Sequence, residues 1–307
     1  MILQEKLKII QKISGLTQTE IAAKVGVSFV AFNNWWTGKS QPHKNKLFII
    51  DNLYKELTGQ KIIPDDILTA KKELIIKEAK KYPNILKTII SSPDIYEQFL
   101  LSLTYNSNKI EGSTLSENET ADIMFNNRAL PNKSLIEQLE VKNHQTALQY
   151  LFNYLQANKE IDKDIILKLH SILLNGIRDD AGLFRNHGVR IVGSNVPTAN
   201  YPKLPELMDD LIYDINKKNK DSIALVANIH AHFEQIHPFA DGNGRIGRLI
   251  MVAMLIKFNF PPAVIKQEIK HQYYNCLSKA QLKGDYSQLE NFICEAVFKG
   301  FDIINRK

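Results

Sequence analysis

Apolar residues recur every three to four positions along most of the chain, the spacing that places them on one face of an α-helix. After residue 95 this spacing is almost continuous. The helices that it predicts cover residues 99–109, 117–125, 135–156, 162–175, 201–217, 222–237, 243–258, 265–282 and 287–304. The pattern therefore predicts an all-α fold.

One stretch departs from the helical spacing. Residues 187–200 contain a β-branched run at 189–192, which is followed by turn-forming residues at 193–195. Such a run before turn residues is typical of a hairpin. We therefore expect one short β-hairpin in an otherwise helical chain.

The N-terminal segment predicts three short helices joined by tight turns. An amphipathic run covers residues 3–13, and Thr17 and Ser28 each have a side chain suited to cap a new helix. Gly26 supplies the bend between the second and third helices. The pattern T-Q-x-x-I-A-x-x-V-G-V-S-x-x-x-F-x-x-W-x-x-G-K-x-x-P, which starts at Thr17, resembles the helix-turn-helix of phage-repressor-type DNA-binding domains. We expect such a domain over residues 1–57.

The resemblance implies that the helix beginning at Ser28 enters the major groove of DNA. The residues that would face the bases are Phe29, Val30, Asn33 and Asn34. Asparagine can pair with adenine and an apolar side chain can contact a thymine methyl group, but this face carries no Arg or Lys. Two alternatives stay open: a reader of DNA, or a small helical domain used for protein contact.

The charge is concentrated at the N-terminal end. Residues 1–57 hold eight Lys and four acidic residues, so this segment carries +4 of the net charge of +6. A basic N-terminal segment on an otherwise nearly neutral chain indicates that residues 1–57 bind a polyanion, although a lysine-rich surface can also serve solubility alone. Residues 58–94 are lysine-rich, are broken by three prolines and predict a helical connector.

The composition narrows the class of protein. At 44% apolar residues the chain can bury a core, and its two cysteines exclude a disulfide framework and an all-cysteine zinc site. No apolar run approaches the length of about eighteen residues needed to cross a bilayer, and the N-terminus lacks a signal-peptide pattern. We expect a cytoplasmic protein with no membrane partner.

The densest chemical signal lies in residues 236–248, IHPFADGNGRIGR. Pro238 ends the helix that delivers His237, and a new helix is expected to begin around residues 242–244. Glycines at a helix N-terminus let backbone N–H groups approach a phosphate, which the helix dipole also attracts. The segment therefore predicts an anion cradle directly after a candidate base.

Two arginines and an aspartate complete this loop. Arg245 and Arg248 are three positions apart on one helical face, so both guanidinium groups can converge on the same anionic ligand. Asp241 offers a hard oxygen ligand to a Mg²⁺ ion that bridges phosphates. The residues together favour a phosphate site that works with Mg²⁺.

This loop resembles the signature of the Fic family, H-x-F-x-[D/E]-G-N-G-R-x-x-R, and matches it at every defined position. The resemblance implies a helical Fic domain over residues 95–307, with an inhibitory helix within 95–125 and a catalytic core at about 135–290. It also implies an enzyme, a protein adenylyltransferase that transfers AMP from ATP to a Tyr, Ser or Thr hydroxyl of a target protein.

The resemblance implies a role for each residue of the motif. His237 would be the general base that takes the proton from the attacking hydroxyl, and Asp241 would hold Mg²⁺ against the phosphates. The residues implied in ATP binding are Gly242, Asn243, Gly244, Arg245, Gly247 and Arg248, joined by Tyr274 of the QYYNCL segment. For Tyr274, ordinary core packing is an equal alternative to a place beside the adenine.

Two elements outside the motif also match the family. The predicted hairpin, with the preceding G-x-F-R run at 182–185, resembles a target-binding flap, whose residues here are Arg190, Ile191, Val192 and Gly193. The segment from Ser107 to Gly112 resembles the inhibitory pattern [S/T]-x-x-x-E-[G/N]. This second resemblance implies that Glu111 pairs with Arg248 and occupies the space that the γ-phosphate needs.

Two other functions stay open at this point. One is a DNA-binding transcriptional regulator whose Fic domain senses a nucleotide, and the other is a de-AMPylase, an enzyme that removes AMP. The chain could also form a homo-oligomer. Burial of the Glu111 helix between its subunits would be one way to regulate the enzyme.

Overall fold

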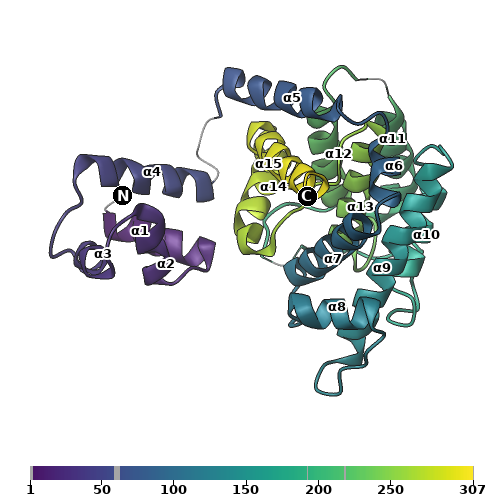
Figure 1. Ribbon diagram of the computed structural model, residues 1–307, viewed down its shortest axis with the longest axis horizontal. Helices are drawn as coiled ribbons and strands as arrows, with labels where there is room; N and C mark the ends of the chain where they lie inside the picture. The colour runs from purple at the N-terminus through teal and green to yellow at the C-terminus, as the bar shows by residue number, and fades with distance from the viewer. Residues whose placement is uncertain (1–2, 59–62, 192, 218, 307) are drawn as a thin grey trace. The chain divides into compact units, whose positions relative to one another are not determined.

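The computed structural model describes residues 3–58, 63–191, 193–217 and 219–306. These residues form fifteen α-helices and two short 3-10 helices, and no β-strand is assigned within them, so the predicted all-α fold is confirmed (Figure 1). The chain divides into two compact units. Unit 1 comprises Met1–Pro64 with Glu268–Leu289, and unit 2 comprises Asp65–Gln267 with Glu290–Lys307.

Unit 1 is a small helical bundle whose caps match the sequence signals. Its helices are α1 (Leu3–Ser14), α2 (Gln18–Val25), α3 (Phe29–Trp36), α4 (Lys44–Leu57) and α14 (Lys270–Lys283). The Thr17 hydroxyl accepts from the Glu20 N–H and the Glu20 carboxylate accepts in return from the Thr17 N–H, while Ser28 caps α3. Gly26 turns the chain between α2 and α3 with φ 71°.

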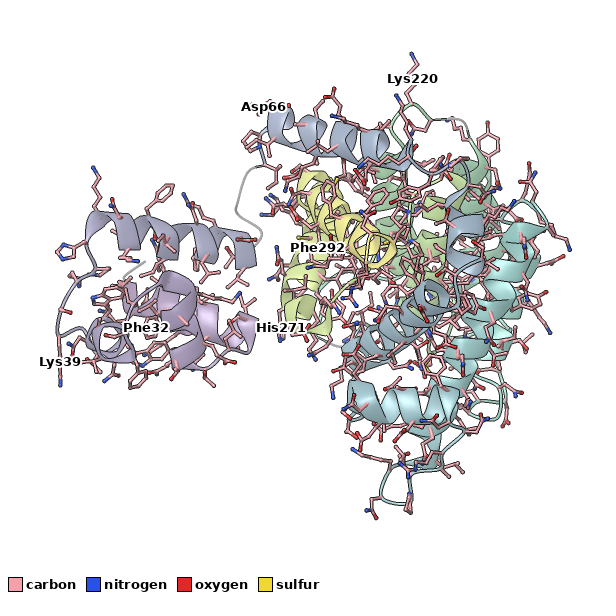
Figure 2. The ribbon with its side chains drawn as sticks, viewed as in Figure 1. Phe32, Lys39, Asp66, Lys220, His271 and Phe292 are labelled. Carbon is pink, nitrogen blue, oxygen red and sulfur yellow. The ribbon has the colours of Figure 1, made fainter. Side chains whose placement is uncertain are left out.

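The core of unit 1 is formed by apolar residues from four of these helices. The members of this core include Leu7, Ile10, Ile21, Phe32 and Ile50, each fully buried. Figure 2 shows Phe32 among the helices and Lys39 at the edge of the unit. The helices therefore keep one face for the core and leave the other to solvent.

The segment between residues 58 and 94 continues into unit 2 as two helices, α5 (Asp65–Ala79) and α6 (Ile85–Ile90). Lys71 on α5 donates to Asn291 at 2.8 Å and also pairs with Glu295. Lys72 pairs with Asp221 and Glu290. These ion pairs fix α5 to other helices of unit 2, so this segment is part of a folded body.

Unit 2 is built around α13. Its other helices are α7 (Pro93–Ile110), α8 (Glu117–Phe125), α9 (Leu135–Gln156), α10 (Lys163–Leu173), α11 (Leu204–Asn216), α12 (Ser222–Ile236) and, from Glu290 onward, α15 (Ser287–Ile304), with a 3-10 helix at Tyr201–Lys203. A second 3-10 helix, Gln267–Ile269, lies where the chain passes from unit 2 to unit 1. Helix α13 (Asn243–Lys257) packs against α7, α9, α10 and α12. Every residue from Arg245 to Ile256 is buried. A helix that is buried on all sides needs no apolar stripe, which explains its continuously apolar sequence.

The expected β-hairpin is not formed as paired strands. The described part of residues 187–200 is an irregular loop, which turns where the Ser194 N–H donates to the Ile191 carbonyl oxygen. The Thr198 hydroxyl donates to the Val189 carbonyl oxygen at 2.7 Å. Val192 lies outside the described residues. The Val196 N–H also donates to the Ser194 hydroxyl at 3.1 Å, so side-chain hydrogen bonds hold the described part of this loop where a ladder of backbone bonds was expected.

Within the described residues, every helix is too short or too polar to cross a membrane.

Close packing of α15 on a proline-containing segment generates a stability prediction. A Cβ atom at Gly300 would lie 2.4 Å from the Pro262 carbonyl oxygen. Gly300→Ala should therefore lower the free energy of unfolding by about 2 kcal/mol, more than the roughly 1 kcal/mol that alanine gains within a helix. Urea unfolding measures the change. Gly188→Ala is the control, because a Cβ there meets nothing within 4 Å; equal stability of the two variants would contradict the tight contact.

Candidate active site

His237 follows α12 directly and has an unusual backbone. It has the left-handed φ of 53°, and its N–H donates to the Phe233 carbonyl oxygen as the helix ends. Its Nδ1 atom lies 3.1 Å from the Glu234 carbonyl oxygen. Because a carbonyl oxygen can only accept, Nδ1 carries the hydrogen and Nε2 is left to accept a proton. The sequence placed a base here, and the structure assigns its tautomer.

The environment favours the neutral imidazole. Burial lowers the pKa of His237 below its ordinary value, the Glu234 carbonyl opposes this, and the charge of Arg185 lowers the pKa further. Glu111 and Asp241 act in the opposite direction. The net lowering of the pKa keeps His237 in its basic form near neutral pH.

Asn243 holds the loop between His237 and α13 in place. Its side chain is 2% exposed, its Oδ1 accepts from the Phe239 N–H at 2.9 Å, and its Nδ2 donates to the Phe239 carbonyl oxygen at 2.9 Å. Sequence reasoning assigned Asn243 to the phosphates. Both ends of its amide group hydrogen-bond within the loop, and the contact of Asn243 with a phosphate stays a prediction.

His170 on α10 is a second brace, and sequence reasoning missed it. Its ring stacks on Phe239 with centroids 3.7 Å apart and an angle of 7° between the planes. Its Nδ1 accepts from the Gly182 N–H at 2.8 Å and its Nε2 donates to the Asp241 carbonyl oxygen at 3.0 Å. Burial lowers the pKa of His170 to about 4. A lone histidine within an apolar helical pattern gave no signal of this role.

Helix α13 begins where the sequence predicted, and a carboxylate lies against its first turn. Gly242 is the N-cap with φ 78° and has no side chain to satisfy the first N–H groups of the helix. A Cβ atom at Gly244 would lie 2.4 Å from Glu111 Oε1. The absence of a side chain at Gly244 thus lets the Glu111 carboxylate reach the first turn of α13.

Arg248 is held by the end of α7. Its Nη2 atom is 2.6 Å from Glu111 Oε1, and its Nε donates to the Ser107 hydroxyl at 2.9 Å. Nη2 also donates to the Ser107 carbonyl oxygen at 3.2 Å. The structure therefore contains the ion pair that the inhibitory pattern implied, and it assigns Ser107 as an additional partner of the guanidinium group.

Arg245 has a different partner from Arg248. Its Nη1 atom is 2.6 Å from Oε1 of Glu140 on α9, and the Arg245 side chain is only 3% exposed. Its Nη2 atom is 3.8 Å from Asp241 Oδ1. The two arginines were expected to converge on one ligand. Each arginine is paired with a carboxylate from a separate helix, and their convergence on one ligand stays a prediction. Sequence reasoning missed Glu140 because it lies 105 positions earlier in the chain.

Asp241 is suited to hold a metal that arrives with a substrate. Its side chain is 52% exposed, and its Oδ1 accepts from the Gly242 N–H at 2.6 Å. Among the described residues there is no group of three or more His, Cys, Asp or Glu side chains that could hold a metal ion. One exposed carboxylate fits the way Mg²⁺ binds with substrate phosphates, because that ion keeps most of its ligands as phosphate and water oxygens.

Two further residues were assigned to ATP, Gly247 and Tyr274. Gly247 is buried against α12, where a Cβ would lie 2.5 Å from Glu234 Oε1 and 3.2 Å from Phe233. It permits α12 and α13 to lie close together, as they do in Figure 1. Tyr274 belongs to α14 in unit 1, where it is 41% exposed and its ring contacts that of Tyr273. Its place beside a nucleotide stays a prediction.

Comparison with known proteins agrees with the motif. Residues 160–255, which include His237 and the whole loop to Arg248, match the model of the Fic/DOC family. The chain is 33% identical over 202 residues to the protein adenylyltransferase Fic of Nematostella vectensis. The matched region is 64% of this chain and 47% of that protein. The protein adenylyltransferase fic-1 of Caenorhabditis briggsae is 33% identical over 196 residues, 62% of this chain and 38% of that protein. The chain thus spans less than half the length of these curated relatives.

Solved structures share the fold. A fragment of Fic-1 from Caenorhabditis elegans superimposes with a TM-score of 0.67 at 22% identity, over 99% of this chain and 93% of that one. A Fic domain containing signaling protein from Bacteroides thetaiotaomicron gives a TM-score of 0.64 at 22% identity, over 76% of this chain and 97% of that one. These likenesses show that the helical arrangement is that of Fic domains.

The lowered pKa of His170 makes stability depend on pH. Between pH 7 and pH 5 the unfolded chain binds a proton at this residue while the folded chain does not, so folding stability is lost as the pH falls. With a folded pKa of about 4, the loss from this group is about 2 kcal/mol. His170→Gln should make the pH dependence of the free energy of unfolding shallower by this amount, measured by urea unfolding at both pH values. His43→Gln changes an exposed histidine and should leave the slope unchanged; similar slopes in all three proteins would contradict the assignment.

Proposed function

We propose that the chain is a protein adenylyltransferase that transfers AMP from ATP to a hydroxyl group of a target protein. The observation that carries this proposal is the pairing of a neutral His237, with Nε2 as its basic atom, with the uncapped N-terminus of α13 six residues later. The match to the Fic/DOC model and the names of the relatives support it. The chain matches less than half the length of those relatives, so their activity is proposed for it.

The reaction follows from these groups. The hydroxyl oxygen of the target attacks the α-phosphorus of ATP, a P–O bond forms to the target, and the bond to the leaving pyrophosphate breaks. His237 Nε2 takes the hydroxyl proton, which raises the nucleophilicity of the oxygen as the bond forms. The N–H groups at the start of α13 stabilise the charge that develops on the phosphate oxygens. Asp241 would hold a Mg²⁺ ion, which neutralises phosphate charge when bound.

The same site is self-inhibited in this proposal. The Glu111 carboxylate lies against Gly244 and pairs with Arg248, so it occupies the position where an anionic phosphate would meet the cradle and the guanidinium group. A phosphate and a carboxylate cannot share this space, and their negative charges repel each other. ATP must therefore displace Glu111 before it can bind in a reactive geometry.

Removal of the carboxylate should release the activity. Glu111→Gly should increase AMP transfer at least about tenfold, the change that corresponds to about 1.4 kcal/mol of lost competition. The measurement is labelling of proteins in a cell lysate by ATP that carries the label on its α-phosphate. His237→Ala in the same background should abolish the labelling, because the base is lost.

Two further variants make this test specific. Glu97→Gly makes the same chemical change at an exposed position of α7 and should leave labelling at the parental level. Glu111→Gln removes only the charge and should give an intermediate increase. Equal labelling with and without Glu111 would show that the carboxylate is not inhibitory, while absence of labelling in every variant would count against AMP transfer itself.

We propose DNA as a second partner, through unit 1. The observation that favours it is the exposure of Phe29 and Val30 at the start of α3, 46% and 69%, beside a capped turn of helix-turn-helix form. Asn33 and Asn34 lie on the same helix and are half-buried. This arrangement offers side chains that suit the major groove.

The DNA proposal predicts binding that weakens with salt. A mobility shift on the DNA upstream of the chain's own gene should lose affinity as salt rises, because lysines that contact phosphates displace counterions. Asn33→Ala should weaken binding to that DNA by about 1–3 kcal/mol if it contacts a base edge, whereas Glu97→Gly in unit 2 should not. Binding that ignores both salt and Asn33 would favour the alternative of a protein partner for α3.

A further inference from the structure

Arg185 is a buried arginine that binds four main-chain carbonyl groups. Only 4% of the surface of this residue is exposed. Nε donates to the His237 carbonyl oxygen at 2.7 Å and Nη1 to that of His187 at 2.7 Å. Nη2 donates to the carbonyl oxygens of Ala199 at 2.6 Å and Ile236 at 3.3 Å. Its backbone N–H also donates, to the Pro238 carbonyl oxygen at 3.0 Å.

These acceptors belong to two places in the chain. Ile236 and His237 form the end of α12 that carries the base, while His187 and Ala199 lie near the two ends of the loop 187–200. The planar fork of one guanidinium group therefore joins both ends of this loop to the backbone of His237. Lysine cannot reproduce this arrangement, because its ammonium group is a point donor without the fixed fork.

No carboxylate lies within ion-pair distance of Arg185 among the residues that the structure describes. The charge is therefore buried with carbonyl dipoles as its partners, and burial lowers the pKa of Arg185. A buried charge without a counter-charge is costly to fold. Because no carboxylate is paired with it within the described residues, the charge of Arg185 is not cancelled close by and acts on the neighbouring His237.

We propose that Arg185 is a positioning residue, which holds the loop 187–200 at a fixed distance from the His237 imidazole and keeps this imidazole in its basic form. The inference rests on the proposed AMP transfer, in which that loop aligns the target hydroxyl. Rate falls steeply when reacting groups are displaced by as little as about 1 Å, so a loop that is tied to the base would place the hydroxyl correctly.

The electrostatic part concerns every charged group that faces His237. Burial is the main cause of the lowered pKa of His237, and Arg185 lowers this pKa further, whereas the hydrogen bond to the Glu234 carbonyl, Glu111 and Asp241 raise it. A bound triphosphate adds more negative charge and would raise the pKa of His237 further, which would protonate the base. The charge of Arg185 opposes this effect and preserves Nε2 as a proton acceptor.

The test compares Arg185→Lys and Arg185→Gln with the parent, in the full chain. Hydrogen exchange of the amides in 187–200 should become about tenfold faster in both variants, because the loop loses hydrogen bonds worth about 1.4 kcal/mol. Amides of α9 should keep their exchange rates. The control is Arg178→Gln, which removes an exposed arginine that is paired with Asp180 just before this segment. It should leave the exchange rates of both the loop and α9 unchanged.

A second measurement isolates the charge. An NMR titration of the His237 ring should give the parental midpoint in Arg185→Lys, which keeps the charge, and a higher midpoint in Arg185→Gln, which removes it. Arg178→Gln should leave the midpoint unchanged. If Arg185→Gln does not fold, Arg185→Met replaces it, because it also removes the charge and keeps a long side chain in the same place, and it should likewise raise the midpoint.

Activity gives a third readout that separates this inference from the proposed function. In the Glu111→Gly background, Arg185→Lys should lower the rate of labelling about 100-fold at saturating Mg-ATP while the KM for ATP changes little. Absence of labelling in Glu111→Gly itself would overturn the proposed function, but the exchange and titration results would still decide the role of Arg185. Unchanged exchange at 187–200, or equal acceleration at α9, would overturn the positioning role, and an unchanged midpoint in Arg185→Gln would overturn the electrostatic one.

Discussion

The need to neutralise two arginines on a buried helix organises the site. Helix α13 is enclosed along nearly its whole length, so the guanidinium groups of Arg245 and Arg248 cannot rely on water. Each of these two charges is paired with a carboxylate from another helix: Glu140 on α9 and Glu111 at the end of α7. Two ion pairs thus draw distant helices around the first turns of α13.

The loop that follows His237 is fixed by contacts with Asn243, His170 and Arg185. Asn243 clamps Phe239 from within the loop, His170 stacks on the same ring and holds the Asp241 carbonyl, and Arg185 holds the carbonyl of His237. The left-handed backbone of His237 is a costly conformation for a residue with a side chain. It persists because the surrounding hydrogen bonds determine the path of the chain on both sides.

Local signals in the sequence predicted local structure well. The caps at Thr17 and Ser28, the helical spacing and the helix start at 242–244 needed only neighbouring residues, and the structure contains each of them. The hairpin failed because β-branched residues favour strands only where a partner strand completes the ladder. The partnership of Glu140 with Arg245 and the stacking of His170 depend on residues far apart in the chain, and spacing along the sequence carries no record of them.

The absence of a side chain at Gly244 matters to two groups, the Glu111 carboxylate and the phosphate of the proposed reaction. The Glu111 carboxylate reaches the first turn of α13 only because no side chain stands there, and in the proposed reaction a phosphate would need the same clearance. A side chain at 244 would therefore obstruct the Glu111 carboxylate and, in the proposed reaction, the phosphate as well. A change at this position cannot favour one of the two over the other through space alone.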